Sequence, residues 1–112
     1  MKVDELEKII NSAFEDRMNI SETSDQKILD AINQTIDLTD KGSIRVAEKK
    51  NGNWSVNQWV KKAILLSFRT SKMTMSKGPY TTWYDKVPGK SVLWNENDWK
   101  NAGYRHVPNG VV

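Results

Sequence analysis

Two neighbouring side chains near the end of the sequence, in the string GYRHVP, have the chemistry to bind or react with a substrate. Arg105 carries a guanidinium, which can hold a carboxylate through two parallel hydrogen bonds. His106 is the sole histidine, and a single imidazole can serve as a general base. Without cysteines or clustered carboxylates, however, a lone histidine is a weak metal ligand, and beside Pro108 a surface or interface role is the simpler interpretation. Arg105 and Arg45 are therefore the better anion-binding candidates, and an ordinary surface position fits Arg45 better than Arg105.

The composition limits what other chemistry the chain can carry. The 112 residues fit one domain, and they include no cysteine, which excludes disulfides, thiolate metal sites and cysteine nucleophiles. The sequence has no nucleophile-elbow, phosphate-loop, dinucleotide-binding or zinc-protease pattern, and it predicts neither a metal site nor a catalytic residue. No apolar run reaches the roughly 20 residues of a membrane helix. Acidic residues stand in the N-terminal stretch where a signal peptide would be apolar, so we expect a cytoplasmic protein and no membrane partner.

The charge is distributed unevenly along the chain. Residues 1–40 carry ten acids and four bases, a net charge of −6, whereas residues 41–112 carry thirteen bases and four acids, a net charge of +9. Any attraction for an anion should therefore reside in the second part. The basic pairs Lys49-Lys50 and Lys61-Lys62 could contact phosphates, and tryptophans can stack on bases. Trp54 and Trp59 nevertheless fall on predicted apolar faces, so we do not expect nucleic-acid binding.

The elements that would position these side chains can be predicted from hydrophobic periodicity. Residues 3–17 have apolar residues at helical spacing, and a second amphipathic stripe runs from an N-cap at Ser24 to about Asp40, with Gly42 as its C-terminal glycine. Two helices with a short connection form an antiparallel hairpin. Alternating residues on either side of Asn51-Gly52 then predict a β-hairpin. Placing all its apolar residues on one face requires a three-residue loop that pairs Val46 with Val56 and leaves Gly52 left-handed.

The third helix, at about residues 58–70, has the widest apolar arc and is predicted to be the most buried. Trp59, Ala63, Ile64 and Phe68 should pack against Ile32, Ile36 and the apolar face of the β-hairpin. Glycine and proline pairs then indicate a loop with short extended pieces. Asn95, Asp98 and Gly103 predict the N-cap, capping box and end of a short helix, and a strand-like segment closes the chain. The predicted fold class is α+β, a small and mostly helical domain over residues 1–112. It comprises a helical hairpin at 1–41, a β-hairpin at 43–57, and a helix, loop, short helix and strand at 58–112.

Several dispersed strings make the sequence resemble a known family. RVAEK, the W…QW.KKA.LLSFR block, YDKVP and GYRHVP are similar, in order and spacing, to the N-terminal domain of tetrahydrodipicolinate N-succinyltransferases, as are IINSAFEDR and IDLTDKG. The resemblance covers nearly all 112 residues. The family has a second proline or similar residue after VP, where Asn109 stands here. In the family, the segment resembling VPNGVV leads into a left-handed parallel β-helix of hexapeptide repeats, which this sequence lacks, so we expect an N-terminal domain separated from its catalytic body.

The resemblance implies an acyltransferase of the diaminopimelate and lysine pathway. Such an enzyme transfers succinyl from succinyl-CoA, its co-substrate, to tetrahydrodipicolinate, and it works as a homotrimer. The acidic catalytic residue of the family lies in the β-helix, so no catalytic residue is expected in this chain and the chain alone should be inactive. Arg105 matches a substrate-binding arginine of the family, while the cofactor-binding residues stay unknown. A stand-alone binding or interaction module without catalytic activity remains the alternative interpretation of the same residues.

Overall fold

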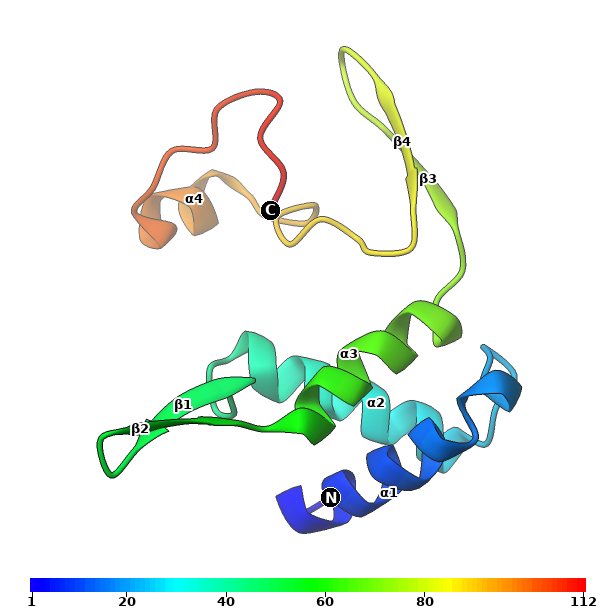
Figure 1. Ribbon diagram of the computed structural model, residues 1–112. Coiled ribbons are helices and arrows are strands. Elements are labelled where there is room, and N and C mark those ends of the chain that lie inside the picture. Colours follow the sequence, from blue (N-terminus) through cyan, green and yellow to red (C-terminus); the bar gives the residue numbers. More distant parts are fainter. The chain divides into compact units, whose positions relative to one another are not determined.

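The computed structural model describes residues 1–112 and divides them into two compact units, Met1–Met73 and Thr74–Val112. The first unit contains α1 (Val3–Glu15), a 3-10 turn (Arg17–Asn19), α2 (Gln26–Asp40), β1 (Ala47–Lys50), β2 (Asn53–Val56) and α3 (Gln58–Thr70). The second contains β3 (Thr74–Lys77), β4 (Thr82–Asp85) and α4 (Glu96–Ala102). Figure 1 shows both units along the coloured chain. Helices and two antiparallel hairpins thus make up a small α+β fold without a β-helix, as predicted. None of the helices has the length and apolarity that a membrane crossing requires.

The core of the first unit lies where α1, α2 and α3 pack against one another. Its fully buried large hydrophobic side chains are Leu6 and Ile10 of α1, Ile32 of α2, and Val60 and Leu66 of α3. Burial of each such side chain stabilises the fold by roughly 1.5–3 kcal/mol. The helix α3 contributes more buried residues than either partner, so the prediction of a buried third helix is confirmed.

The side of α3 that is buried differs from the predicted one. Trp59 and Ala63 are buried and Ile64 packs against the core, but Phe68 is 43 % exposed and Leu66 is fully buried instead. Ile32 is buried, whereas Ile36 is only partly so. The prediction for Phe68 was wrong because the apolar arc of α3 is wider than the contact area of two helices, and the sequence does not say which edge of the arc stays outside.

The two helices of the N-terminal hairpin begin and end close to the predicted positions. The first stops at Glu15, where the 3-10 turn takes over, rather than at residue 17. The N-cap of α2 is Asp25 rather than Ser24, because the Asp25 carboxylate accepts the backbone N–H of Lys27 at 2.8 Å. Gly42 follows α2 with a φ of +72°, the left-handed conformation expected of a C-terminal glycine.

The β1–β2 hairpin has a two-residue turn, so the predicted three-residue loop was wrong. Lys49 lies opposite Trp54, and Asn51 and Gly52 have φ values of +49° and +80°. Positive φ at both positions defines a type I′ turn, whose twist matches that of the strands and which favours Asn-Gly. The predicted register relied on burial of one hairpin face, yet Trp54 is 73 % exposed and Val56 is 49 % exposed. Without burial to enforce a register, the chemistry of the turn decides it.

The second unit consists of a β-hairpin, a short helix and connecting segments. The extended pieces predicted after α3 pair as β3 and β4, from Thr74 opposite Asp85 to Lys77 opposite Thr82. The predicted closing strand is absent, because residues 104–112 contain a turn at Pro108-Asn109 and pair with no other strand. A strand needs a neighbour for its backbone hydrogen bonds, and only one backbone bond, from the Lys90 N–H to the Val112 carbonyl, joins residues 104–112 to an earlier segment.

Candidate functional site around Arg105 and His106

The helix α4 precedes the candidate site and is capped at both of its ends, which fixes where the chain leaves the helix. At its start the Asp98 N–H donates to the Asn95 side chain and the Asn95 N–H donates to the Asp98 carboxylate, both at 2.9 Å. At its end Gly103 adopts a φ of +72° and its N–H reaches the Trp99 carbonyl. The predicted capping box and helix stop are both confirmed. Arg105 therefore follows a fixed helix end by two residues.

An aromatic cluster holds the residues on either side of Arg105. The rings of Trp94 and Trp99 meet edge to face with centroids 4.8 Å apart. Tyr104 packs against Trp99 at 5.6 Å, and His106 lies against the same ring at 5.4 Å. Edge-to-face aromatic pairs contribute roughly 0.5–1.5 kcal/mol each beyond the area that they bury. Trp99 thus anchors the chain before and after Arg105.

The side chain of Arg105 is exposed, and no carboxylate of the chain forms an ion pair with it. The residues on either side of it, Tyr104 and His106, both contact the Trp99 ring, while Arg105 between them stays exposed. A guanidinium that is held at its backbone and has no internal partner is free to bind a carboxylate. This arrangement was predicted from the sequence, although Tyr104 is still 45 % exposed.

His106 faces inward toward a cavity. Its Nε2 atom is buried and has no hydrogen-bond partner. The ring lies so close to Gly110 that a Cβ there would come within 2.8 Å of the His106 Cδ2 atom and 2.9 Å of the Val107 carbonyl oxygen. Only glycine fits at this point of the turn, which the Gly110 N–H closes on the Val107 carbonyl at 2.9 Å. The interpretation of His106 as an ordinary surface or interface residue missed this contact, since nothing in the spacing of the sequence shows that position 110 lies against the ring.

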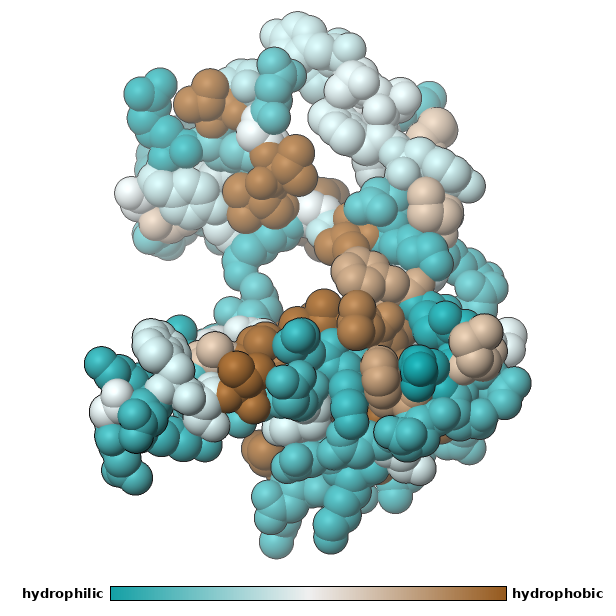
Figure 2. Space-filling model, in the orientation of Figure 1, coloured by the Kyte–Doolittle hydropathy of each residue, from teal (hydrophilic) through white to brown (hydrophobic).

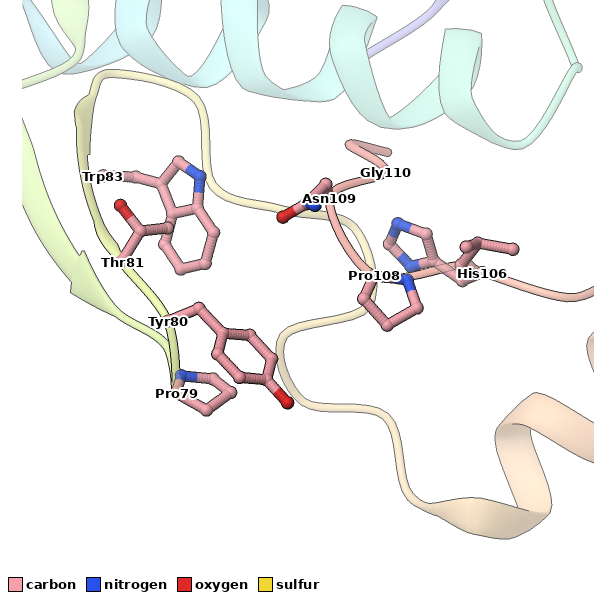
Figure 3. A pocket seen from close by; sticks show the side chains of 9 residues that line it. Pro79, Tyr80, Thr81, Trp83, His106, Pro108, Asn109 and Gly110 are labelled. Atoms are coloured by element: carbon pink, nitrogen blue, oxygen red, sulfur yellow. The ribbon is translucent and has the colours of Figure 1, made fainter.

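The cavity beside His106 has a volume of about 230 Å³. Figure 3 shows its two sides, with Pro79, Tyr80, Thr81 and Trp83 from the β3–β4 hairpin on one and His106 to Gly110 on the other. A larger pocket of about 580 Å³ shares Trp83, His106 and Gly110 with it. Apolar and polar side chains line both, and the aromatic residues of the hairpin were not identified as pocket residues from the sequence.

Two of the other basic side chains considered from the sequence, Lys50 and Lys62, have partners in the first unit. Lys50 pairs with the Glu48 carboxylate at 2.9 Å, and Lys62 donates to the Asn11 side chain at 2.8 Å. The pKa of Glu48 is lowered, first by the Asn57 side-chain hydrogen bond at 3.0 Å and then by Lys50. Arg45 is exposed, and its charge lowers the pKa of Glu48 slightly further.

Comparison with known proteins identifies the class to which this fold belongs. The sequence profile of the family described as tetrahydrodipicolinate N-succinyltransferase N-terminal matches residues 5–70. The chain belongs to this family, as the resemblance of its motifs predicted.

Individual relatives are similar in sequence to this protein over nearly the whole chain. The 2,3,4,5-tetrahydropyridine-2,6-dicarboxylate N-succinyltransferase of Pelagibacter ubique is 56 % identical over 111 residues, which are 96 % of this chain and 40 % of that protein. The enzyme of the same name from Agrobacterium fabrum is 49 % identical over 96 % of this chain and 39 % of its own length. The one from Rhodopseudomonas palustris is 47 % identical over 100 % of this chain and 41 % of its own length. The chain therefore spans about two-fifths of the length of the curated relatives that it matches.

Proposed function

We propose that this chain is the N-terminal part of an N-succinyltransferase that acts on tetrahydrodipicolinate with succinyl-CoA in the biosynthesis of diaminopimelate and lysine. One observation carries the proposal, namely an identity of 47–56 % over 96–100 % of the chain to enzymes whose names state this substrate and this reaction. Water opens the cyclic imine to a free amine and a ketone. The amine nitrogen then attacks the thioester carbonyl, an amide C–N bond forms, and the C–S bond breaks. The proton lost by the amine ends on the departing CoA thiol.

In this reaction we assign Arg105 the role of binding one carboxylate of the dicarboxylate substrate. The support is its exposed guanidinium without an internal ion pair, set on a backbone that Trp99 anchors on both sides. Such a group neutralises one substrate charge and fixes its orientation, which lowers the entropy cost of bringing the amine to the thioester. We place the catalytic acid and the CoA-binding groups outside these 112 residues. A homotrimer in the cytoplasm completes the proposal by analogy with the family.

The test compares the 112-residue chain with the protein encoded by the complete gene. The gene is expected to continue beyond codon 112 with hexapeptide repeats, and a stop codon there would favour the stand-alone binding module. CoA release from succinyl-CoA is measured with and without the cyclic dicarboxylate, and the second sample gives the background of thioester hydrolysis. We expect the full-length protein to turn over at about 1 per second or faster, in the ordinary enzymatic range, and the 112-residue chain to show background alone. Dicarboxylate-dependent CoA release by the short chain, or none by the long one, would contradict the proposal.

A further inference from the structure

The unit Thr74–Val112 has no hydrophobic core of its own. Every fully buried hydrophobic side chain of the protein belongs to Met1–Met73, and none of the 39 residues from Thr74 to Val112 is buried. Taking this unit by itself can only increase the exposure of its side chains. Its exposed large hydrophobic residues are Met75, Tyr80, Trp83, Tyr84, Val87, Val92, Leu93, Tyr104, Val107, Val111 and Val112.

Such a unit is too weakly held to fold by itself. A two-stranded hairpin such as β3–β4 is at best marginally stable in water, and a chain of about 40 residues normally needs a disulfide, a metal or a partner. The capping box of α4 and the rings around Trp99 give local order, but the backbone entropy lost on ordering each residue opposes folding. Another surface must supply the missing burial.

A groove in this unit shows where that surface would bind. The apolar side chains of Trp83, Val87, Val92, Val111 and Val112 line the pocket of about 580 Å³, beside the polar Thr74, Ser76, Ser91 and His106. Lys77 and Asp85 add opposite charges at the same pocket, which suits a mixed apolar and polar segment rather than a strongly charged ligand. Figure 2 shows hydrophobic side chains at the surface of this unit around the point where Figure 1 marks the C-terminus.

We propose that this groove binds the part of the full-length protein that follows residue 112, an inference that rests on the proposed function. The relatives are about two and a half times as long as this chain, so they contain enough further residues to cover it. Val111 and Val112 line the groove themselves, and the Val112 carbonyl accepts the Lys90 N–H at 3.0 Å, so any following residues emerge beside it. A tethered segment binds at an effective concentration in the millimolar range. A second copy of the chain would instead lose translational and rotational freedom.

Hydrogen–deuterium exchange of the 112-residue chain and of the full-length protein gives a direct test. In the short chain we expect protection of α1, α2 and α3 and almost none between residues 74 and 112. In the full-length protein we expect the amides of residues 74–112 to exchange at least about tenfold more slowly, because burial of the groove opposes local opening. Equal exchange of this region in the two proteins would overturn the proposal.

A matched pair of substitutions locates the effect in the groove. Val92 lines the groove and is 68 % exposed, while Val56 of β2 is 49 % exposed and belongs to the other unit. In the full-length protein, Val92→Asp should speed up amide exchange of residues 74–112 by at least about tenfold, to a rate near that of the short chain. The reason is that the contact would remove water from a carboxylate and place it against an apolar surface. Val56→Asp should leave exchange of that region unchanged. A Val92→Asp protein with the protection of wild type would refute the proposed contact.

Two other occupants of the groove give distinct results. If residues 1–73 cover it, the short chain itself protects residues 74–112 at every concentration. If a second copy covers it, that protection rises with concentration together with the mass measured by sedimentation. Either result would overturn the proposal. The enzymatic proposal is judged separately by CoA release: an active full-length protein with an unprotected region 74–112 refutes the docking alone, and a protected but inactive protein refutes the activity alone.

Discussion

Replacing Arg105 by lysine in the full-length protein separates the geometry of the guanidinium from its charge. Lysine keeps the positive charge but offers a point charge in place of a planar fork, so it cannot form two parallel hydrogen bonds to one carboxylate. A hydrogen bond to a charged group contributes about 1.5–3 kcal/mol. Loss of one of the two bonds should therefore lower kcat/KM by roughly 10- to 150-fold, since each 1.4 kcal/mol corresponds to a factor of ten.

The structure also predicts what Arg105→Lys should leave unchanged. Because Arg105 is exposed and forms no ion pair within the chain, the free energy of unfolding should change by less than about 0.5 kcal/mol. The assay measures CoA release over a range of dicarboxylate concentrations, alongside thermal unfolding of the same samples. Arg45→Lys serves as the control, since Arg45 is also exposed but is held by a different unit, and it should change neither quantity. An Arg105→Lys enzyme with wild-type kcat/KM, or one that loses activity only because it unfolds, would refute the reasoning.

Three further predictions concern the first unit and can be checked in the 112-residue chain. Leu66→Ala should lower the free energy of unfolding in urea by about 2–5 kcal/mol, while Leu65→Ala, at a position that is 51 % exposed, should cost much less; similar losses would contradict the observed packing. Gly52→Ala should cost about 1 kcal/mol, because the space around it is open and only the positive φ opposes a Cβ, and an unchanged unfolding curve would argue against the type I′ turn. The carboxyl of Glu48 should titrate by NMR below its ordinary pKa of 4.5, and Asn57→Ala should raise that pKa. Because the pKa is lower in the folded state, the stability that Glu48 contributes is present above pH 4.5 and is lost as the pH falls through the folded pKa. A pKa that Asn57→Ala leaves unchanged would contradict the assigned cause.

The features that could be predicted from the sequence are those that local chemistry determines. The helix bounds at α3, the capping box at Asn95 and the left-handed conformations of Gly42 and Gly103 each depend on a few adjacent residues. The register of the β1–β2 hairpin was predicted wrongly because its argument needed tertiary burial, and Trp54 is exposed. The exposure of Phe68 was missed for a related reason, since periodicity defines an apolar arc but not which part of it meets a neighbour.

The candidate site was predictable only in part for the same reason. The exposure of Arg105 without a carboxylate partner agrees with the sequence-based prediction, although the closing strand from which it was argued is absent. The contact of His106 with Gly110 and the contribution of Trp83 to the cavity bring together residues from the β3–β4 hairpin and the closing segment. Such non-local approaches have no periodic signature, so they require coordinates.

The contact of Tyr104 and His106 with a single tryptophan restricts how the gene can change in length. Deleting or inserting one codon between Gly103 and His106 would shift by one position the residues that contact Trp99. The guanidinium would then lie against the Trp99 ring, and an aromatic side chain would be exposed to solvent in its place. The Asn51-Gly52 turn joins two exposed strands and has no such constraint. Across related genes we therefore expect insertions and deletions to accumulate at the hairpin tip and to be absent from the three codons that follow the glycine at the end of α4.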